Sequence, residues 1–127
     1  MTYLPAKKDT LHIPSGPTGN HLFAIITDPC HEGTQLLVCF SSVKPGVHHD
    51  TACLVGAGEH PFVTVPSAIE YRFARVEPSA HLVKCVEGWT FKRGEPVSDA
   101  LLQKIRVGVL KSRFATRFIK DYFTKNA

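Results

Sequence analysis

Two short apolar segments without polar alternation place the strongest constraint on how this chain can fold. They span residues 22–27 and 35–42, and the first is rich in β-branched side chains. A strand with one solvent-exposed face alternates polar and apolar residues. These runs therefore predict strands that are covered on both faces or that line a barrel interior. The chain has 127 residues, which is room for one domain around one core.

Further short strands are expected along the first two-thirds of the chain. Residues 10–13 alternate and run into 14–20, a cluster of Pro, Gly, Ser, Thr and Asn that predicts a turn. The segment 43–60 has little periodicity, so it predicts a long loop with at most a short strand near 52–55. Additional strands are predicted at 62–65, 71–76 and 81–86.

The hydrophobic period changes to that of a helix from residue 98 onward. Ser98 and Asp99 form a good helix start. The apolar residues that follow share one helical stripe and are Leu101, Leu102, Ile105 and Val109. A second short helix is predicted near 116–123. Strands followed by helices predict a single domain, residues 1–127, of the mainly β class: a small barrel or sandwich over about 8–92, with C-terminal helices over about 98–124.

Charge and cysteine usage narrow the function classes. Fifteen Lys and Arg against eleven Asp and Glu leave a net charge of +4, which permits a polyanionic partner such as RNA. No run approaches the roughly 18 apolar residues of a membrane span, and the N-terminus lacks the apolar run of a secretory signal. The four cysteines form no C-x-x-C pair, so we expect reduced thiols in a cytoplasmic protein, with Cys39 in the core.

Two polar positions flank the apolar segments and are candidates for chemistry. His21 lies between the turn cluster and the first apolar run. One interpretation is a general acid or base at the beginning of a strand, and the alternative is a surface or half-buried histidine without a chemical role. Ser41 and Ser42 end the second run, and Lys44 follows them. Their hydroxyls either bind a phosphate oxygen, with Lys44 supplying charge, or cap the strand and start a turn.

The loop that follows carries a second group of candidates. His48, His49 and Asp50 precede Cys53, which invites a zinc hypothesis. The spacing matches none of the common zinc patterns, so no metal and no cofactor is predicted. One of the two histidines is a candidate for proton transfer or phosphate contact, and the alternative is an ordinary polar loop.

Arg72 is a further candidate for substrate contact, because a buried guanidinium needs a carboxylate or a bound phosphate as its acceptor. It lies three residues before Arg75, so the two side chains are expected on opposite faces of the strand. By the same two-residue period, Tyr71, Phe73 and Arg75 share one face and Arg72, Ala74 and Val76 share the other.

Taken in order, these segments resemble the MazF/PemK type of toxin endoribonuclease over roughly residues 8–110. Residues 8–13 stand where that family has a G-D-x-[LIV] strand, with Lys8 in place of Gly. Residues 19–26 fit its G-x-R-P-A-[LV]-V-[LV] strand, with His21 at the position of the catalytic arginine and Leu22 in place of Pro. Residues 39–44 are similar to the third strand, which ends in a Thr/Ser pair. Residues 60–72 and 98–111 resemble the substrate-facing edge and the terminal helix.

The resemblance implies an SH3-like β-barrel with a C-terminal helix and metal-independent cleavage of single-stranded RNA. It implies His21, Ser41 and Ser42 as catalytic residues, a cognate antitoxin and a homodimer. Substrate contacts are assigned to Lys44, His48, His49 and Arg72. The alternative is a non-catalytic module of the same fold that binds nucleic acid or protein, and a metal-dependent enzyme using His48, His49 and Cys53 is a third, weaker hypothesis.

Overall fold

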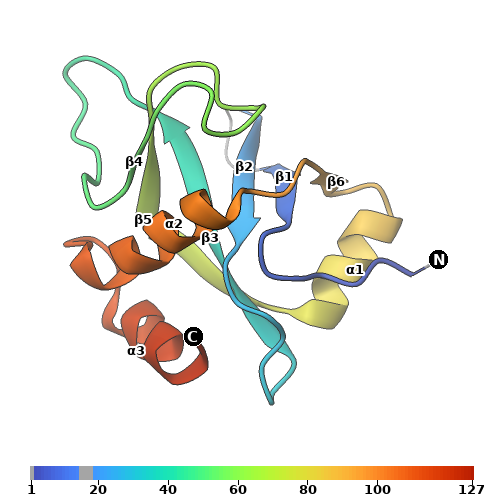
Figure 1. Cartoon of the computed structure of the whole chain (residues 1–127). Helices are drawn as coiled ribbons and strands as arrows, with labels where there is room; N and C mark the ends of the chain where they lie inside the picture. The colour runs from blue at the N-terminus through green and yellow to red at the C-terminus, as the bar shows by residue number, and fades with distance from the viewer. Residues whose placement is uncertain (1, 15–18) are drawn as a thin grey trace.

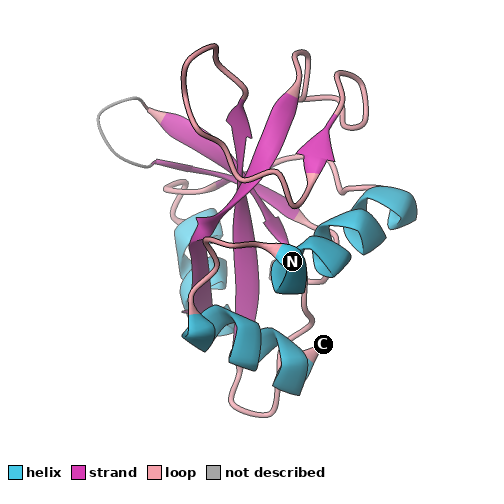
Figure 2. Cartoon of the chain, turned by 90° about the vertical axis from the view of Figure 1, so that its left-hand side faces the viewer, coloured by secondary structure: helices cyan, strands magenta, loops and turns pink. Residues whose placement is uncertain are grey.

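One twisted antiparallel sheet with helices on both faces forms the body of the protein (Figure 1). The computed structural model describes residues 2–14 and 19–127. Within them the strand order is β4-β5-β3-β2-β1-β6, and every recorded neighbour pair is antiparallel. The strands are β1 Thr10–Pro14, β2 Asn20–Ile25, β3 Thr34–Ser42, β4 Leu54–Val55, β5 Ser67–Pro78 and β6 Lys92–Arg93. In Figure 2 the strands fan out, as strands do in a strongly twisted sheet.

Strands β2 and β3 are covered on both faces, as their sequence predicts. Alternate residues of β3 belong to two separate apolar clusters: Leu36, Val38 and Phe40 face one side, while Leu37 and Cys39 face the other. Helix α1, Ser79–Glu87, supplies Leu82 to the second cluster. The first cluster receives side chains from α2, Asp99–Lys111, and from α3, Arg117–Asn126. The predicted core position of Cys39 is confirmed, since it is 4% exposed.

Both predicted C-terminal helices are present and begin where their capping residues indicate. The Ser98 hydroxyl accepts a hydrogen bond from the Leu101 amide at 3.0 Å, and the Thr116 hydroxyl accepts one from Ile119 at 3.2 Å. All four predicted apolar positions of α2 are buried. The coarse prediction of a mainly β domain with C-terminal helices is therefore confirmed. No helix in the described part of the chain has the length and apolar character needed to cross a membrane.

Two predicted strands are wrong. Residues 81–86 belong to helix α1, because Leu82, Cys85 and Val86 lie at helical spacing and pack together against the second apolar cluster. Residues 62–65 form a loop between Pro61 and Pro66, whose rings remove two backbone donors that a sheet would need. The turn predicted for 14–20 falls partly on residues 15–18, which lie outside the described residues.

A large bulge in β5 corrects the predicted face assignment of that strand. Leu37 pairs with Arg75 but Cys39 pairs with Glu70, so five steps along β5 span two steps along β3. The bulge changes the alternation: Tyr71 packs in the same cluster as Ala74 and Val76, whereas Phe73 is exposed. The buried Tyr71 hydroxyl donates to the Ile105 carbonyl at 2.7 Å and so fixes α2 against the sheet.

Gly108 of α2 leaves room for that tyrosine, which gives a first testable prediction. A Cβ at position 108 would overlap the Tyr71 hydroxyl. Alanine normally favours a helix interior by about 1 kcal/mol over glycine. Here we expect Gly108→Ala to lower the free energy of unfolding by roughly 1–2 kcal/mol, because overpacking costs more than the helix gains. Urea unfolding measures the change. Val107→Ala, on the exposed side of the same helix, serves as control, and a stabilised Gly108→Ala would contradict the packing argument.

Candidate functional site

An open pocket of about 460 Å³ lies where β2 and β3 diverge. The pairing recorded between the two strands runs only from Phe23↔Cys39 to Ile25↔Leu37. Beyond that point His21 pairs with Ile13 of β1, and Ser41 pairs with Ala68 of β5. We call this opening the splayed-strand pocket. It is lined by Asn20, His21, Leu22, Phe40, Ser41, Ser42, Ser67 and residues 61–65.

The three residues predicted to be catalytic all line the splayed-strand pocket. They come from two strands, with His21 on β2 and both Ser41 and Ser42 at the end of β3. The Nδ1 atom of His21 is buried and has no hydrogen-bond partner among the described residues. Buried polar atoms are nearly always satisfied in native proteins, so this unpaired nitrogen sets His21 apart from the other buried polar groups of the described residues.

The loop over the pocket is held in place by a buried histidine that the sequence analysis did not single out. His60 is 3% exposed, and its Nε2 atom donates to the Glu95 carbonyl at 2.6 Å. Its Nδ1 atom accepts the Phe62 amide at 3.1 Å. The two bonds together require the neutral ring with its proton on Nε2. His60 therefore positions the pocket wall at Phe62.

Phe62 connects the pocket to the edge of the sheet. Its ring packs edge-on against His12 of β1, with 4.7 Å between ring centroids. Burial lowers the pKa of His12, and the positive charge of the nearby Lys92 adds to the effect, so the neutral form of His12 is favoured. Phe62 and His12 thus form a continuous aromatic surface that leads out of the pocket toward Lys92, the cross-strand neighbour of His12.

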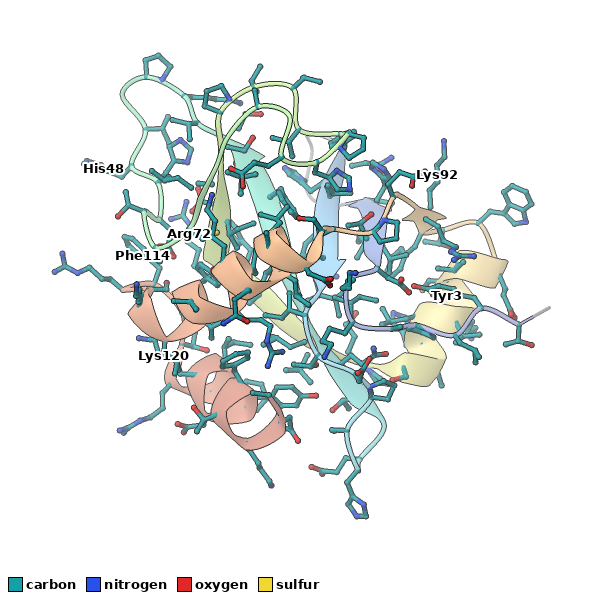
Figure 3. All side chains as sticks on the ribbon, in the orientation of Figure 1. Tyr3, His48, Arg72, Lys92, Phe114 and Lys120 are labelled. Atoms are coloured by element: carbon teal, nitrogen blue, oxygen red, sulfur yellow. The ribbon has the colours of Figure 1, made fainter. Side chains whose placement is uncertain are left out.

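The pocket itself carries no permanent charge, because no Lys, Arg, Asp or Glu is among its described lining residues. Lys44 is exposed two residues after β3. Arg72 is also exposed and lines a separate cavity of about 40 Å³ with His48, Asp50, Glu70 and Phe114. Figure 3 shows Arg72 and His48 on the same side of the molecule, opposite Lys92. The structure therefore does not bring Arg72 to His21, and contact of Lys44 or Arg72 with substrate stays a prediction.

His49 has a structural task in the loop that follows β3. Its Nδ1 atom donates to Glu70 Oε2 at 2.7 Å, and its Nε2 atom accepts the Lys44 amide at 3.1 Å. The other oxygen of Glu70 accepts the Asp50 amide, and the Asp50 carboxylate accepts the Ser112 hydroxyl. This network joins the loop, β5 and the end of α2. Both ring nitrogens of His49 are occupied, whereas His48 beside it is exposed.

The zinc hypothesis finds no support in the geometry. Cys53 is buried in the apolar cluster that contains Tyr71, and burial raises the pKa of its thiol. Within the described ranges 2–14 and 19–127, no three His, Cys, Asp or Glu side chains gather as a metal ion would require.

Neither a protein-family model nor a curated protein matches this sequence. The splayed-strand pocket combines the imidazole of His21 on β2 with the hydroxyls of Ser41 and Ser42 on β3. Such a group can transfer a proton and donate hydrogen bonds to an anionic oxygen. We therefore base the functional assignment on this pocket.

The structure also distinguishes the four free thiols by their reactivity. Hydrogen bonding to Thr34 lowers the pKa of the Cys30 thiol to about 6, and the Oγ1 atom of Thr34 lies 3.1 Å from the sulfur. Burial raises the pKa of Cys39 to about 11. Because the thiolate is the nucleophile, Cys30 is the reactive cysteine of the chain at neutral pH.

This difference predicts selective alkylation. At pH 7 we expect iodoacetamide to modify Cys30 first, with a rate that falls by half near pH 6 as the thiolate takes up a proton. Peptide mass spectrometry after short exposures to iodoacetamide at a series of pH values measures the alkylation rate of Cys30. Thr34→Val removes the hydrogen bond and should move the midpoint to higher pH. An unchanged midpoint in that variant would contradict the assigned cause.

The adjacent histidines give a matched pair for a stability test. His49→Ala breaks two hydrogen bonds and leaves the Glu70 carboxylate, 4% exposed, without its imidazole partner. We expect a loss in the free energy of unfolding on the order of 1–3 kcal/mol. His48→Ala changes an exposed side chain and should stay within about 0.5 kcal/mol of the parent. Equal effects of the two substitutions in thermal unfolding would show that the network does not hold the loop.

Proposed function

We propose that this chain is a MazF/PemK-like endoribonuclease that cleaves single-stranded RNA in the splayed-strand pocket without a metal ion. The observation that supports it most is the convergence of His21, Ser41 and Ser42. These residues are twenty positions apart in sequence and were assigned together by the family resemblance, and they line one pocket. The imidazole of His21 adds to this support, because histidine is the side chain most often used as a general acid or base.

The proposed chemistry uses the RNA's own 2′-hydroxyl as nucleophile. Its oxygen bonds to the adjacent phosphorus while the bond from phosphorus to the 5′-oxygen breaks, so a cyclic phosphate and a 5′-hydroxyl end form. His21 accepts the proton of the 2′-hydroxyl or delivers one to the leaving 5′-oxygen, and a water molecule makes the other of these two proton transfers. The hydroxyls of Ser41 and Ser42 donate hydrogen bonds to the phosphate oxygens, where negative charge builds up.

The same resemblance underlies our proposals for the fold family, the partners and the location. We propose that the sheet is a variant of the SH3-like barrel. We also propose that the protein forms a homodimer, binds a cognate antitoxin and is located in the cytoplasm. The large bulge in β5 and the separation of β2 from β3 support a curled sheet, since bulges bend strands and increase local twist.

One observation favours a second candidate, a non-catalytic module that binds RNA or protein. The family's arginine is replaced by His21, and no permanent positive charge lines the pocket among the described residues. Stabilisation of developing negative charge is a large part of catalysis in comparable sites, so this loss weakens the case for cleavage more than the case for binding.

Substitution of His21 tests the catalytic proposal. General acid–base help is worth about 10²–10⁴-fold, so His21→Ala should slow the cleavage of a single-stranded oligoribonucleotide by that factor. The parent should cleave equally fast with and without EDTA. His31→Ala, an exposed histidine on the β2–β3 hairpin, is the matched control and should retain full activity.

The outcomes separate the two candidates. Cleavage by the parent that disappears in His21→Ala supports the nuclease. Binding of the oligonucleotide without any cleavage by the parent supports the non-catalytic module, and cleavage that His21→Ala leaves unchanged refutes the assignment of His21.

A further inference from the structure

Trp89 is an unusual residue for which the fold gives no structural reason. It is the only tryptophan of the chain, and its side chain is 93% exposed. Its backbone is in the left-handed region, with φ 66°, just after Gly88, the C-cap of α1. Bulky residues rarely adopt this conformation, and glycine commonly does at the end of a helix. A strained and exposed aromatic residue points to a use outside the core.

Two free cations stand next to this indole. Trp89, Lys92 and Arg93 line a shallow pocket of about 480 Å³ together with Val86 and Phe91. Lys92 and Arg93 make up β6, an edge strand that pairs only with β1 in the described sheet. Both are exposed, and the ion pairs found among the described residues include neither. Arg93 lies over the Tyr3 ring, 4.7 Å from its centroid, which orients the guanidinium.

A continuous surface joins this group to the splayed-strand pocket. Lys92 is the cross-strand neighbour of His12, and neighbouring strands lie about 4.8 Å apart. His12 packs against Phe62, whose ring lines the pocket. A ligand that leaves the pocket over Phe62 therefore reaches Lys92 after crossing one aromatic pair. Figure 3 places Lys92 on the same side of the molecule as Tyr3.

We propose that Trp89, Lys92 and Arg93 form a binding platform for single-stranded RNA, the β6 platform, which holds the strand that enters the splayed-strand pocket. An unpaired base stacks on the indole, and the phosphates on either side contact the two cations. Exposed aromatic residues beside basic ones are the common way to bind single strands without sequence preference. The proposal rests on the proposed function. It also supplies the positive charge that the pocket lacks.

The single tryptophan makes the test direct, because intrinsic fluorescence reports only on Trp89. Titration of the parent and of His21→Ala with a single-stranded oligoribonucleotide should quench the emission to saturation. A duplex of the same sequence should not quench it at the same concentrations, since its bases are already stacked. Failure of the single strand to change the emission would overturn the platform.

Substitutions at Trp89 separate stacking from folding. By anisotropy of a labelled oligoribonucleotide, Trp89→Ala should bind about 5- to 150-fold more weakly, as expected for the loss of one stacked base. Trp89→Phe retains a ring and should lose less. Trp89→Gly should bind as weakly as Trp89→Ala while its Tm is equal to or above that of the parent, because glycine relieves the left-handed backbone. Parent-like RNA affinity in Trp89→Ala would refute the proposal.

Salt dependence tests the two cations. The double variant Lys92→Ala/Arg93→Ala should lower the slope of log affinity against log salt by about 1.4, from roughly 0.7 per phosphate contact with a single strand. Arg117→Ala/Lys125→Ala removes the same charge from the exposed face of α3 and should leave the slope unchanged. Equal changes in the two variants would show an effect of net charge alone and would overturn the proposed contacts.

The platform and the proposed nuclease can fail independently. Quenching without cleavage would support the platform and refute the nuclease. If the parent protein cleaves RNA but its tryptophan emission does not change when RNA is added, the nuclease is supported and the platform is refuted. A dinucleotide fills only the pocket, so Trp89→Ala should cleave it at the parent rate. A long strand also contacts the platform, so Trp89→Ala should cleave it more slowly than the parent when the RNA concentration is below KM. Equal losses on both substrates would overturn the assignment of Trp89 to the platform.

Discussion

Burial of β2 and β3 on both faces is the constraint from which the rest of the structure follows. A strand that is apolar on both sides needs two covers, and α1 supplies one while α2 and α3 supply the other. The sequence becomes polar where this cover ends, at His21 on β2 and at Ser41 on β3. The recorded pairing between the two strands ends at Phe23↔Cys39, while β2 stays paired with β1 and β3 stays paired with β5. The candidate site is thus the exposed end of a doubly buried strand pair.

Hydrogen-bond satisfaction distinguishes the roles of the histidines in and around the site. His49 and His60 use both ring nitrogens within the protein, and each ties an irregular segment to the sheet or to a neighbouring chain segment. Their loss would leave buried polar groups unpaired, which costs more than the hydrogen bonds themselves contribute. His21 differs because its buried Nδ1 atom has no partner in the described part of the chain. Of these three histidines, His21 is therefore the one whose ring is not fully committed to contacts within the described residues.

The sequence predicted elements whose cause is local and missed those whose cause is distant. The helix starts at Ser98 and Thr116 depend on caps within three residues, and the strands at 22–27 and 35–42 depend on composition. The bulge at residues 71–74 reflects packing of Tyr71 against α2, which no local pattern encodes. Residues 81–86 contain two valines, which favour a strand locally, whereas packing of Leu82, Cys85 and Val86 against the second apolar cluster makes this segment part of helix α1.

The same reasoning applies to the candidate site. His21, Ser41 and Ser42 were assigned through the order of family motifs, and the strand pairing then brought them to one pocket. The structural role of His49 depends on Glu70, twenty-one residues away, so the residues around His49 could not show it. Trp89 belongs to no pattern, and the one available signal was a lone tryptophan after a glycine beside two basic residues.

The splayed-strand pocket has no charged lining residue among the described residues, whereas the edge strand β6 carries two cations. In the proposed function, substrate binding at β6 is therefore separate from the reaction in the pocket. In the pocket, the described residues offer an imidazole and hydroxyls, so the reacting phosphate would meet hydrogen-bond donors rather than a fixed cation. At β6 the cations are exposed, and salt screens exposed charges more than buried ones. Attraction of a polyanion at the edge strand would therefore depend on ionic strength, whereas proton transfer would take place at His21 in the pocket. Under the proposed function, positive charge that His21 does not supply would come from nearby, and the exposed Lys92 reaches the pocket through His12 and Phe62.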